Sequence, residues 1–224
     1  MTLEPTLSTL PPPQLRFFPE LDAVPEYFTL YGGTALALRL GHRSSVDFDF
    51  FSNQPVDPGD LAKNISFLKE AERVQVAPNT LKCRVERGGP ILISFFGGLE
   101  LGQAAPRDRV AGRRFYVASL LDIAGTKAAV VQQRAEAKDY IDMDALILNG
   151  IDLPTALSAG KIIYGRAFNP IITLKALSFF NDLATTLPAD VRKRLAAAVK
   201  AVDTANLPVL APYTKRADKS GDRK

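Results

Sequence analysis

The sequence predicts an α+β fold, in which a mixed β-sheet with flanking helices is followed by a purely helical region. Strand-like runs rich in β-branched and aromatic residues occur only before about residue 118, and two of them are joined by a double glycine, as in a hairpin. The later sequence has helical periodicity and helix start signals. A doubly wound parallel sheet would alternate strands and helices throughout, so it is not the expected architecture.

Changes of composition divide the chain into four segments. Residues 1–13 end in three prolines and predict an extended leader, residues 14–118 the α/β core, residues 119–213 the helical region and residues 214–224 a charged tail. The tail contains five basic and two acidic residues, which gives it three of the four net positive charges of the chain. The rest is nearly neutral, so net charge says little about partners.

The core combines short helices with a cluster of strands. Its predicted elements are a helix at 14–28 broken by two prolines, a strand at 29–33, a helix at 34–40, a strand at 46–51, a helix at 57–70 and strands at 71–78, 80–88, 90–96 and 113–119. The helix at 34–40 consists of strong helix formers and is followed by Gly41, the residue type preferred just after a helix. Gly88 and Gly89 form the expected hairpin turn.

The helical region begins at Ser119, a good N-cap, with Asp122 at the third helical position, where a carboxylate suits the helix dipole. Helices are predicted at 119–134, 137–150, 153–165, 169–180 and 188–202. Two of the later ones carry proline at or near the first turn, which fits a helix start.

The composition is that of a soluble globular protein, with 46% hydrophobic and 23% charged residues. No apolar run approaches the roughly 20 residues that span a bilayer, and the N-terminus lacks the basic start and apolar stretch of a signal peptide. The only cysteine, Cys83, and the only histidine, His42, argue against a disulfide framework and a structural zinc site. We therefore expect a cytoplasmic protein without membrane contact, in which any metal is held by carboxylates.

Two short patterns point to chemistry. Gly32 and Gly33 lie between a predicted strand and a helix start, where a close backbone, free N–H groups and the helix dipole favour an anion such as phosphate. One helix later, strand alternation places Asp47 and Asp49 on one face, with Cα atoms roughly 6.5–7 Å apart. Taken separately, the glycines also fit an ordinary turn and the aspartates a solvated sheet face. Together they place an anion site beside a cation site, which a magnesium-bound triphosphate needs.

The stretch GGTALALRLGHRSSVDFDFF resembles the signature of the AbiEii/AbiGii-type toxin nucleotidyltransferases, a branch of the DNA polymerase β-like nucleotidyltransferase superfamily. That superfamily is marked by a glycine turn, a short helix and an Asp-x-Asp strand. The matching positions are Gly32, Gly33, Thr34, Gly41, His42, Arg43, Ser45, Asp47 and Asp49. A second stretch, KAAVVQQRAEAKDYIDMDAL, resembles the downstream motif of the family. Its matching positions are Lys127, Arg134, Lys138, Asp139 and Asp142.

The resemblance implies a polymerase β-like core that moves NMP from an NTP to a hydroxyl acceptor, such as tRNA, with Mg²⁺ or Mn²⁺ as cofactor. The implied metal ligands are Asp47 and Asp49, and the implied catalytic residues are Asp47, Asp49, Lys127 and Asp139. The implied nucleotide-binding residues are Gly32, Gly33, Thr34, Arg43, Ser45, Lys127 and Arg134. The resemblance also implies the toxin of a toxin–antitoxin or abortive-infection system, with a cognate antitoxin protein as partner.

The spacing within the second motif adds two expectations. Lys127 and Arg134 are seven residues apart and would share one face of a helix, suited to the charge of a triphosphate; a solvated face is the alternative. Asp139 and Asp142 are three residues apart and would share a face of the next helix. Of these two, the family resemblance implies that Asp139 is functional, and Asp142 is expected to support packing.

One position departs from the superfamily pattern. A third carboxylate on a later strand usually completes a two-metal site, whereas the strand at 90–96 carries Ser94 where that carboxylate is expected. Glu86, on the preceding strand, is a candidate substitute. We therefore expect one well-held metal at Asp47 and Asp49. The alternative to a transferase is a non-catalytic nucleotide-binding or regulatory module on the same fold.

Overall fold

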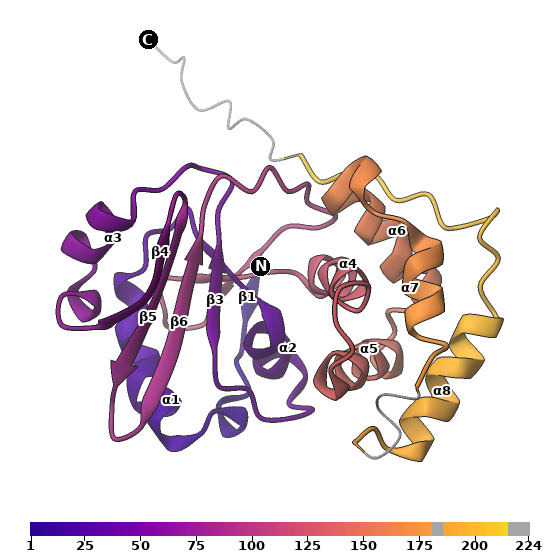
Figure 1. Ribbon diagram of the computed structural model, residues 1–224, viewed down its shortest axis with the longest axis horizontal. Helices are drawn as coiled ribbons and strands as arrows, with labels where there is room; N and C mark the ends of the chain where they lie inside the picture. Colours follow the sequence, from indigo (N-terminus) through magenta and orange to yellow (C-terminus); the bar gives the residue numbers. More distant parts are fainter. Residues whose placement is uncertain (181–185, 215–224) are drawn as a thin grey trace, which may run out of the picture.

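A mixed β-sheet forms one side of the molecule and a group of helices forms the other, in the computed structural model shown in Figure 1. The structure describes residues 1–180 and 186–214. The strands in these residues are β1 (Thr2–Leu3), β2 (Thr29–Tyr31), β3 (Phe48–Phe51), β4 (Glu72–Ala77), β5 (Thr80–Glu86), β6 (Pro90–Phe96), β7 (Asp108–Val110) and β8 (Tyr116–Val117). The α-helices are α1 (Pro12–Phe17), α2 (Gly32–Leu40), α3 (Pro58–Asn64), α4 (Leu120–Val130), α5 (Ala137–Leu148), α6 (Leu153–Tyr164), α7 (Pro170–Ala176) and α8 (Ala189–Lys200). Short 3-10 helices are η1 (Leu7–Thr9), η2 (Phe18–Ala23), η3 (Ser66–Leu68) and η4 (Gly165–Ala167).

The strands are ordered β1-β7-β8-β2-β3-β6-β5-β4 across the sheet. β3 pairs antiparallel with β2 and parallel with β6, and β4, β5 and β6 form an antiparallel meander. The hairpin of β5 and β6 turns at Gly88 and Gly89, as predicted. Both pairing directions occur in one sheet, and the described strands precede residue 118 while α4 to α8 follow it, so the predicted α+β class is confirmed.

Strand β3 separates the apolar core from the polar side of the sheet. Phe48 and Phe50 are fully buried, whereas Asp49 and Phe51 point to the opposite face, as strand alternation requires. On the buried face, the Phe48 ring contacts that of Phe17 from α1, with ring centroids 5.8 Å apart. The sheet therefore packs on the core through its aromatic face, and the polar side chains of a site can lie on its other face.

β3 begins two residues later than the strand predicted at 46–51. The carbonyl of Val46 accepts a hydrogen bond from Gln14 Nε2 at 3.1 Å, and the carbonyl of Asp47 accepts one from the Thr34 hydroxyl. Because side chains engage these two carbonyls, residues 46 and 47 lie outside the sheet ladder. Asp47 is thus fixed by α2 just before the strand, and Asp49 by the strand itself.

Helices α2 and α4 bring the two sequence motifs together. α2 ends at Gly41, whose left-handed backbone (φ 67°) provides the predicted C-cap. α4 follows Ser119, whose hydroxyl accepts a hydrogen bond from the Asp122 N–H at 3.0 Å, as expected for an N-cap. α4 packs against α2, α5 and α6, and in Figure 1 it lies between the sheet and the outer helices.

Three expectations are changed by the structure. The leader at 1–13 is predicted to be extended, but it contains η1 and the start of α1, and its β1 pairs parallel with β7. β1 and β7 fall outside the predicted strands because two or three residues show too little alternation. α4 ends at Val130, so the helix predicted at 119–134 is shorter and does not contain Arg134. The predicted tail lies, apart from residue 214, outside the described residues.

Within the described ranges, none of the single helices has both the length and the apolar character to cross a bilayer. The consecutive segments Ala137–Leu148 and Leu153–Ala167 satisfy these criteria only when joined, and a bend of 114° separates them.

Candidate active site

The turn from β2 into α2 leaves backbone N–H groups open to a ligand. Gly32 has a left-handed backbone (φ 75°), and the N-cap Tyr31 provides no side-chain hydrogen bond to the first turn. A Cβ on Gly33 would lie 2.6 Å from Arg43 Nη2 and 3.0 Å from Ser45 Oγ, so a larger residue here would displace the Arg43 guanidinium. The start of α2 therefore combines uncapped N–H groups with the positive end of a helix dipole, which favours an anion.

The two aspartates lie next to this turn. Asp49 on β3 is directly opposite Ser94 on β6 in the strand register. Burial and the nearby charge of Asp47 raise the pKa of Asp49, although hydrogen bonding by Ser94 lowers it in part. None of the ion pairs within the described residues involves Asp47 or Asp49, although cationic side chains surround them.

A divalent cation fits this pair. Two neighbouring carboxylates without an ion-pair partner, one of them largely buried, are destabilised by their mutual repulsion, and a metal ion relieves it. Groups of three or more His, Cys, Asp or Glu side chains that could hold a metal do not occur in the part of the chain described. Asp47 and Asp49 are thus a two-carboxylate site, which suits a magnesium ion that keeps its other positions for water and phosphate oxygens.

Asp142 on α5 joins the first motif to the second. Its side chain is fully buried, and its Oδ1 lies 2.7 Å from His42 Nε2. Arg43 donates to both of its oxygens, at 2.6 and 2.8 Å, and Lys127 Nζ lies 2.5 Å from Oδ2. Burial would raise the pKa of Asp142, but the hydrogen bonds from His42 and Arg43 and the charge of Lys127 outweigh it and hold the pKa well below its usual range.

Asp139 forms the second half of this buried network. Lys127 Nζ donates to its Oδ1 at 2.9 Å, and Arg134 Nε donates to its Oδ2 at 2.8 Å. Burial would raise the pKa of Asp139, but Arg134 and Lys127 lower it overall. Lys127 is 4% exposed and held between two aspartates, so its ammonium group has a fixed position at the wall of the site.

The structure therefore changes several expectations about the second motif. Arg134 reaches Asp139 from the segment between α4 and α5, and not from the same helix face as Lys127. Asp142, expected to support packing, pairs with two cations, as Asp139 does, and is also within hydrogen-bond distance of His42. Neither aspartate is exposed, so both position the cations around them. Their shared helix face is as predicted.

Two residues of the sequence-based site lie elsewhere. The Thr34 side chain is 1% exposed, and its hydroxyl bonds to Ser45 Oγ at 2.9 Å and to the Asp47 carbonyl. It therefore holds the Asp47 segment in place. Glu86, the candidate third carboxylate, is at the far end of β5, where its carboxylate accepts from the Gly89 N–H, and it does not replace Ser94 in the site.

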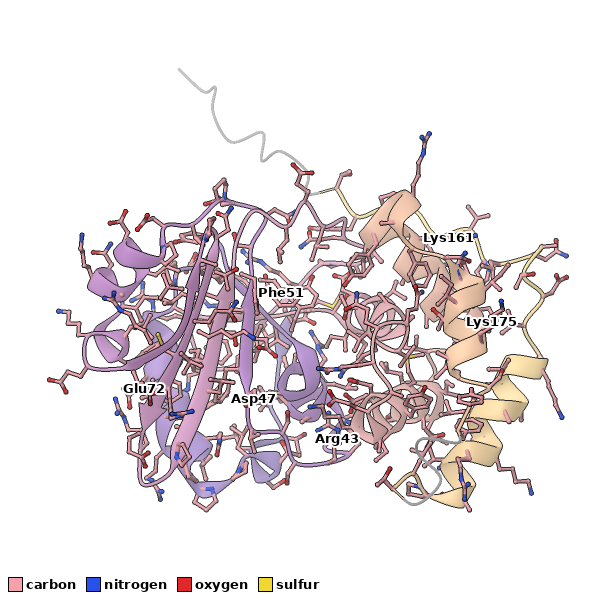
Figure 2. All side chains as sticks on the ribbon, in the orientation of Figure 1. Arg43, Asp47, Phe51, Glu72, Lys161 and Lys175 are labelled. Atoms are coloured by element: carbon pink, nitrogen blue, oxygen red, sulfur yellow. The ribbon has the colours of Figure 1, made fainter. Side chains whose placement is uncertain are left out.

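Apart from the buried Asp139, which lies behind Lys127 and Arg134, the remaining predicted site residues line one cavity of about 350 Å³. Its wall contains two carboxylates and five cationic side chains, which favours a polyanionic ligand bound with a metal. The cationic residues are Arg43, Lys82, Lys127, Arg134 and Lys138. In Figure 2, Asp47 and Arg43 lie near one another where the sheet meets the helices. The lining residues that lie outside both motifs include Lys82 and Tyr164. The sequence does not mark them, because only the strand register and helix packing bring them to the cavity.

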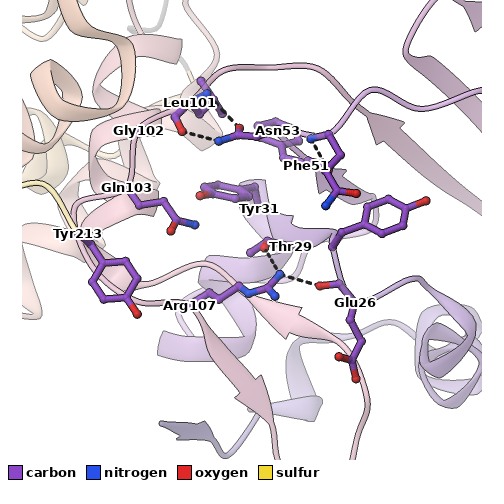
Figure 3. Close-up of a pocket in the computed structure, with 13 residues that line it drawn as sticks. Glu26, Thr29, Tyr31, Phe51, Asn53, Leu101, Gly102, Gln103, Arg107 and Tyr213 are labelled. Carbon is purple, nitrogen blue, oxygen red and sulfur yellow. Dashed lines mark hydrogen bonds between the residues drawn. The ribbon is translucent and has the colours of Figure 1, made fainter. Parts of the chain in front are cut away.

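A second, more open cavity of about 620 Å³ adjoins the first, and Phe51 lines both (Figure 3). The Phe51 ring stacks on Tyr31, with centroids 4.9 Å apart. Arg107 contacts the face of Tyr116 at 3.8 Å and donates to neutral oxygens, including Thr29 Oγ1. Burial lowers the pKa of Arg107, and none of the ion pairs in the described part of the chain involves it. A half-buried cation without a carboxylate ion-pair partner makes this cavity receptive to an anion.

Comparisons with known proteins agree with this geometry. The family model described as "Nucleotidyl transferase AbiEii toxin, Type IV TA system" matches residues 20–207. An uncharacterised protein of Aquifex aeolicus (strain VF5) is 32% identical over 168 residues, which cover 73% of this chain and 79% of that protein.

Two solved structures share the fold. MenT4, a nucleotidyltransferase toxin of Mycobacterium tuberculosis H37Rv, has a TM-score of 0.59 at 16% identity, covering 84% of this chain and 81% of its own. A candidate nucleotidyltransferase of H. pylori has a TM-score of 0.52 at 14% identity, covering 83% of this chain and 90% of its own. At these identities the likeness concerns the fold.

Proposed function

The chain belongs to the AbiEii family of nucleotidyltransferase toxins, and on this premise we propose that it uses Mg²⁺ or Mn²⁺ to transfer NMP from an NTP to a hydroxyl group of an RNA such as tRNA. The observation that carries the proposal is one cavity in which Asp47 and Asp49 face the uncapped start of α2 and a set of cationic side chains. A metal-bound triphosphate needs these three features together.

In this proposal, the N–H groups at Gly32 and Gly33 bind phosphate oxygens, and Lys127 neutralises triphosphate charge from a fixed position. Asp47 and Asp49 would hold the metal, which would supply positive charge at the phosphates and orient them. The acceptor hydroxyl oxygen forms a bond to the α-phosphorus in line with the leaving group. The bond from the α-phosphorus to pyrophosphate breaks, pyrophosphate keeps the electron pair, and the hydroxyl proton passes to water.

The adjoining cavity supports an RNA acceptor. Single-stranded nucleotides are recognised by cationic groups and aromatic faces, and this cavity contains Arg107 together with Tyr27 and Tyr213 (Figure 3). Phe51 lines both cavities, so in this proposal an RNA end in the second cavity lies beside the nucleotide site. We expect Tyr213→Ala to raise the KM for RNA several-fold while the Kd for NTP stays unchanged.

The family description also bears on partners and location. A type IV toxin–antitoxin system pairs its toxin with an antitoxin, so we expect a cognate antitoxin protein in the same genome. NTP and tRNA are cytoplasmic substrates, which places the proposed reaction in the cytoplasm.

The test is label transfer from each of the four NTPs, radiolabelled on the α-phosphate, to total RNA in the presence of Mg²⁺. We expect wild type to label RNA and Asp49→Ala to give no signal above background. Glu72→Gln, at the exposed outer strand of the sheet in Figure 2, is the control and should label RNA like wild type. NTP binding by wild type without transfer to any RNA would support the non-catalytic module instead.

A further inference from the structure

We propose that Lys82 is a catalytic residue whose ammonium group takes the place of a second metal ion beside Asp49. The inference rests on the proposed function, since it concerns how the same site stabilises the transfer of a nucleotidyl group. It assigns a role to a residue that belongs to neither sequence motif, and it accounts for the absence of a carboxylate at Ser94.

The strand register relates Lys82 to Asp49 through Ser94. Asp49 on β3 is paired with Ser94 on β6, and Ser94 is paired with Lys82 on β5. The three side chains therefore form one row across three adjacent strands, on the same face of the sheet, because directly opposed residues point to the same side. All three line the same cavity. Lys82 thus reaches the place next to the metal-binding aspartates from the side opposite α4.

Lys82 also differs from the other cations of the cavity in its partners. Lys127 and Arg134 bind Asp139, Arg43 binds Asp142, and Lys138 binds Glu136. Among the described residues, Lys82 takes part in none of the ion pairs, and its ammonium lies 5.6 Å from the centre of the Phe96 ring. It is half-buried and its charge lowers the pKa of Asp49. Its charge is therefore available to a ligand.

Ser94 has a hydroxyl where the superfamily usually has a carboxylate, and this difference fits the position of Lys82 on the neighbouring strand. A second divalent cation at this place would need a third negative group, and the neutral hydroxyl of Ser94 does not supply one. A carboxylate at residue 94 would instead neutralise Lys82 on the neighbouring strand. Serine leaves the ammonium unpaired, so a single positive charge occupies the position that a second metal would otherwise occupy.

In the proposed step, the acceptor oxygen forms its bond to the α-phosphorus while the bond to pyrophosphate breaks, and the hydroxyl proton leaves to water. Negative charge spreads over the α-phosphate oxygens as this happens. Lys82 donates to one of these oxygens and stabilises the charge that develops there. Such a group acts on the transition state more than on the bound NTP, so it affects kcat more than binding.

The first experiment measures kcat and the Kd for NTP in Lys82→Ala and Lys82→Arg. Losing one preorganised donor typically lowers kcat about 100-fold or more, and we expect this for Lys82→Ala with a Kd for NTP within about threefold of wild type. Lys82→Arg, which keeps the charge, should recover part of the rate. Lys63→Ala, an exposed lysine of α3, is the control. Wild-type kcat in Lys82→Ala would overturn the proposal.

The second experiment counts bound Mn²⁺ by electron paramagnetic resonance, with a non-hydrolysable NTP analogue present. We expect one Mn²⁺ per chain in wild type and Lys63→Ala, and two in the double variant Lys82→Ala/Ser94→Asp, in which a carboxylate replaces the lysine charge. Two Mn²⁺ ions in wild type would contradict the proposal. If wild type transfers no label to any RNA, the proposed function fails; if it transfers label and Lys82→Ala is equally fast, only the role of Lys82 fails.

Discussion

Asp142 connects two stretches of sequence that lie about a hundred residues apart. It binds His42 and Arg43 from the segment before β3 and Lys127 from α4, and its side chain is fully buried. Each of these contacts fixes a group at the cavity wall or next to it. The residue is therefore a positioning residue for the site, in addition to any contribution to packing.

We expect Asp142→Asn to be strongly destabilising. Removing one charge from a buried ion-pair network leaves Arg43 and Lys127 incompletely compensated and costs about 3–5 kcal/mol. The measurement is the free energy of unfolding in urea. Glu72→Gln removes an exposed ion pair with Arg84 and should cost at most about 1 kcal/mol. Equal losses of unfolding free energy in the two variants would show that the buried network of Asp142 stabilises the fold no more than an exposed ion pair does.

Asp49 is expected to lower the stability of the protein in the absence of ligand. Burial and the charge of Asp47 raise its pKa in the folded state above the value in the unfolded chain. The folded protein therefore binds the proton more tightly, so the stability contributed by this group is present at acid pH and is lost as the pH rises through the folded pKa.

Asp49→Asn removes the carboxylate whose ionisation lowers the stability of the folded protein. The variant without metal should have a higher Tm than wild type at pH 7, and the difference should shrink as the pH is lowered toward 4. Melting curves in EDTA between pH 4 and pH 7 measure it. A wild type more stable than Asp49→Asn at pH 7 would mean that the aspartate is already well compensated by Lys82 and Lys127.

At the scale of elements, α4 is held in place by its contact with α6. A Cβ on Gly125 of α4 would lie 2.7 Å from the backbone carbon of Ala159 and 2.8 Å from the nitrogen of Gly160. The two helices thus approach with almost no space for a side chain. This close packing fixes the depth at which α4 presents Lys127 to the cavity.

Gly125→Ala should therefore separate the two helices and lower the free energy of unfolding by about 1–3 kcal/mol, the usual range for overpacking. It should also raise the KM for NTP, because Lys127 moves with α4. Urea unfolding and initial rates measure the two effects. The Cβ would also lie 2.7 Å from Ile163 Cδ1, but adding Ile163→Ala should not restore stability, since backbone atoms are as close. Full rescue would show that only the Ile163 side chain is in the way.

At the scale of the whole molecule, the candidate site joins the sheet to the helical side. The aspartates come from the β3 segment, the glycines from the start of α2 and Lys127 from α4. A ligand that contacts all three binds the folded protein and not the unfolded chain, so it stabilises the fold by mass action.

Mg²⁺ with NTP at 100 times its Kd should thus add about 2.7 kcal/mol to the free energy of unfolding and raise the Tm. The measurement is a melting curve with and without both ligands. EDTA or the double variant Asp47→Asn/Asp49→Asn should abolish the increase, and Lys175→Ala, on the outer helix α7 in Figure 2, should keep it. An increase that persists in the double variant would place the metal elsewhere.

The sequence predicts the fold class and most element positions, because these depend on local patterns, and the family resemblance marks most but not all of the charged residues that line the cavity. Alternation predicted the two faces of β3, and Gly41 predicted the end of α2. The glycines and aspartates predicted a candidate phosphate site beside a candidate metal site. The short strands β1 and β7 could not be predicted from the sequence, since the pairing of two or three residues is decided by their neighbours.

Which of these side chains face or pair with one another depends on the tertiary structure. Lys82 faces Asp49 through strand register, which depends on three strands at once, and no local pattern along β5 records it. Asp142 pairs with His42 and Arg43, which lie about a hundred residues earlier in the sequence, and with Lys127. Its charge network therefore forms only after α2, α4 and α5 have packed. Local spacing predicts faces and caps, whereas the pairing of buried charges follows from which elements come into contact.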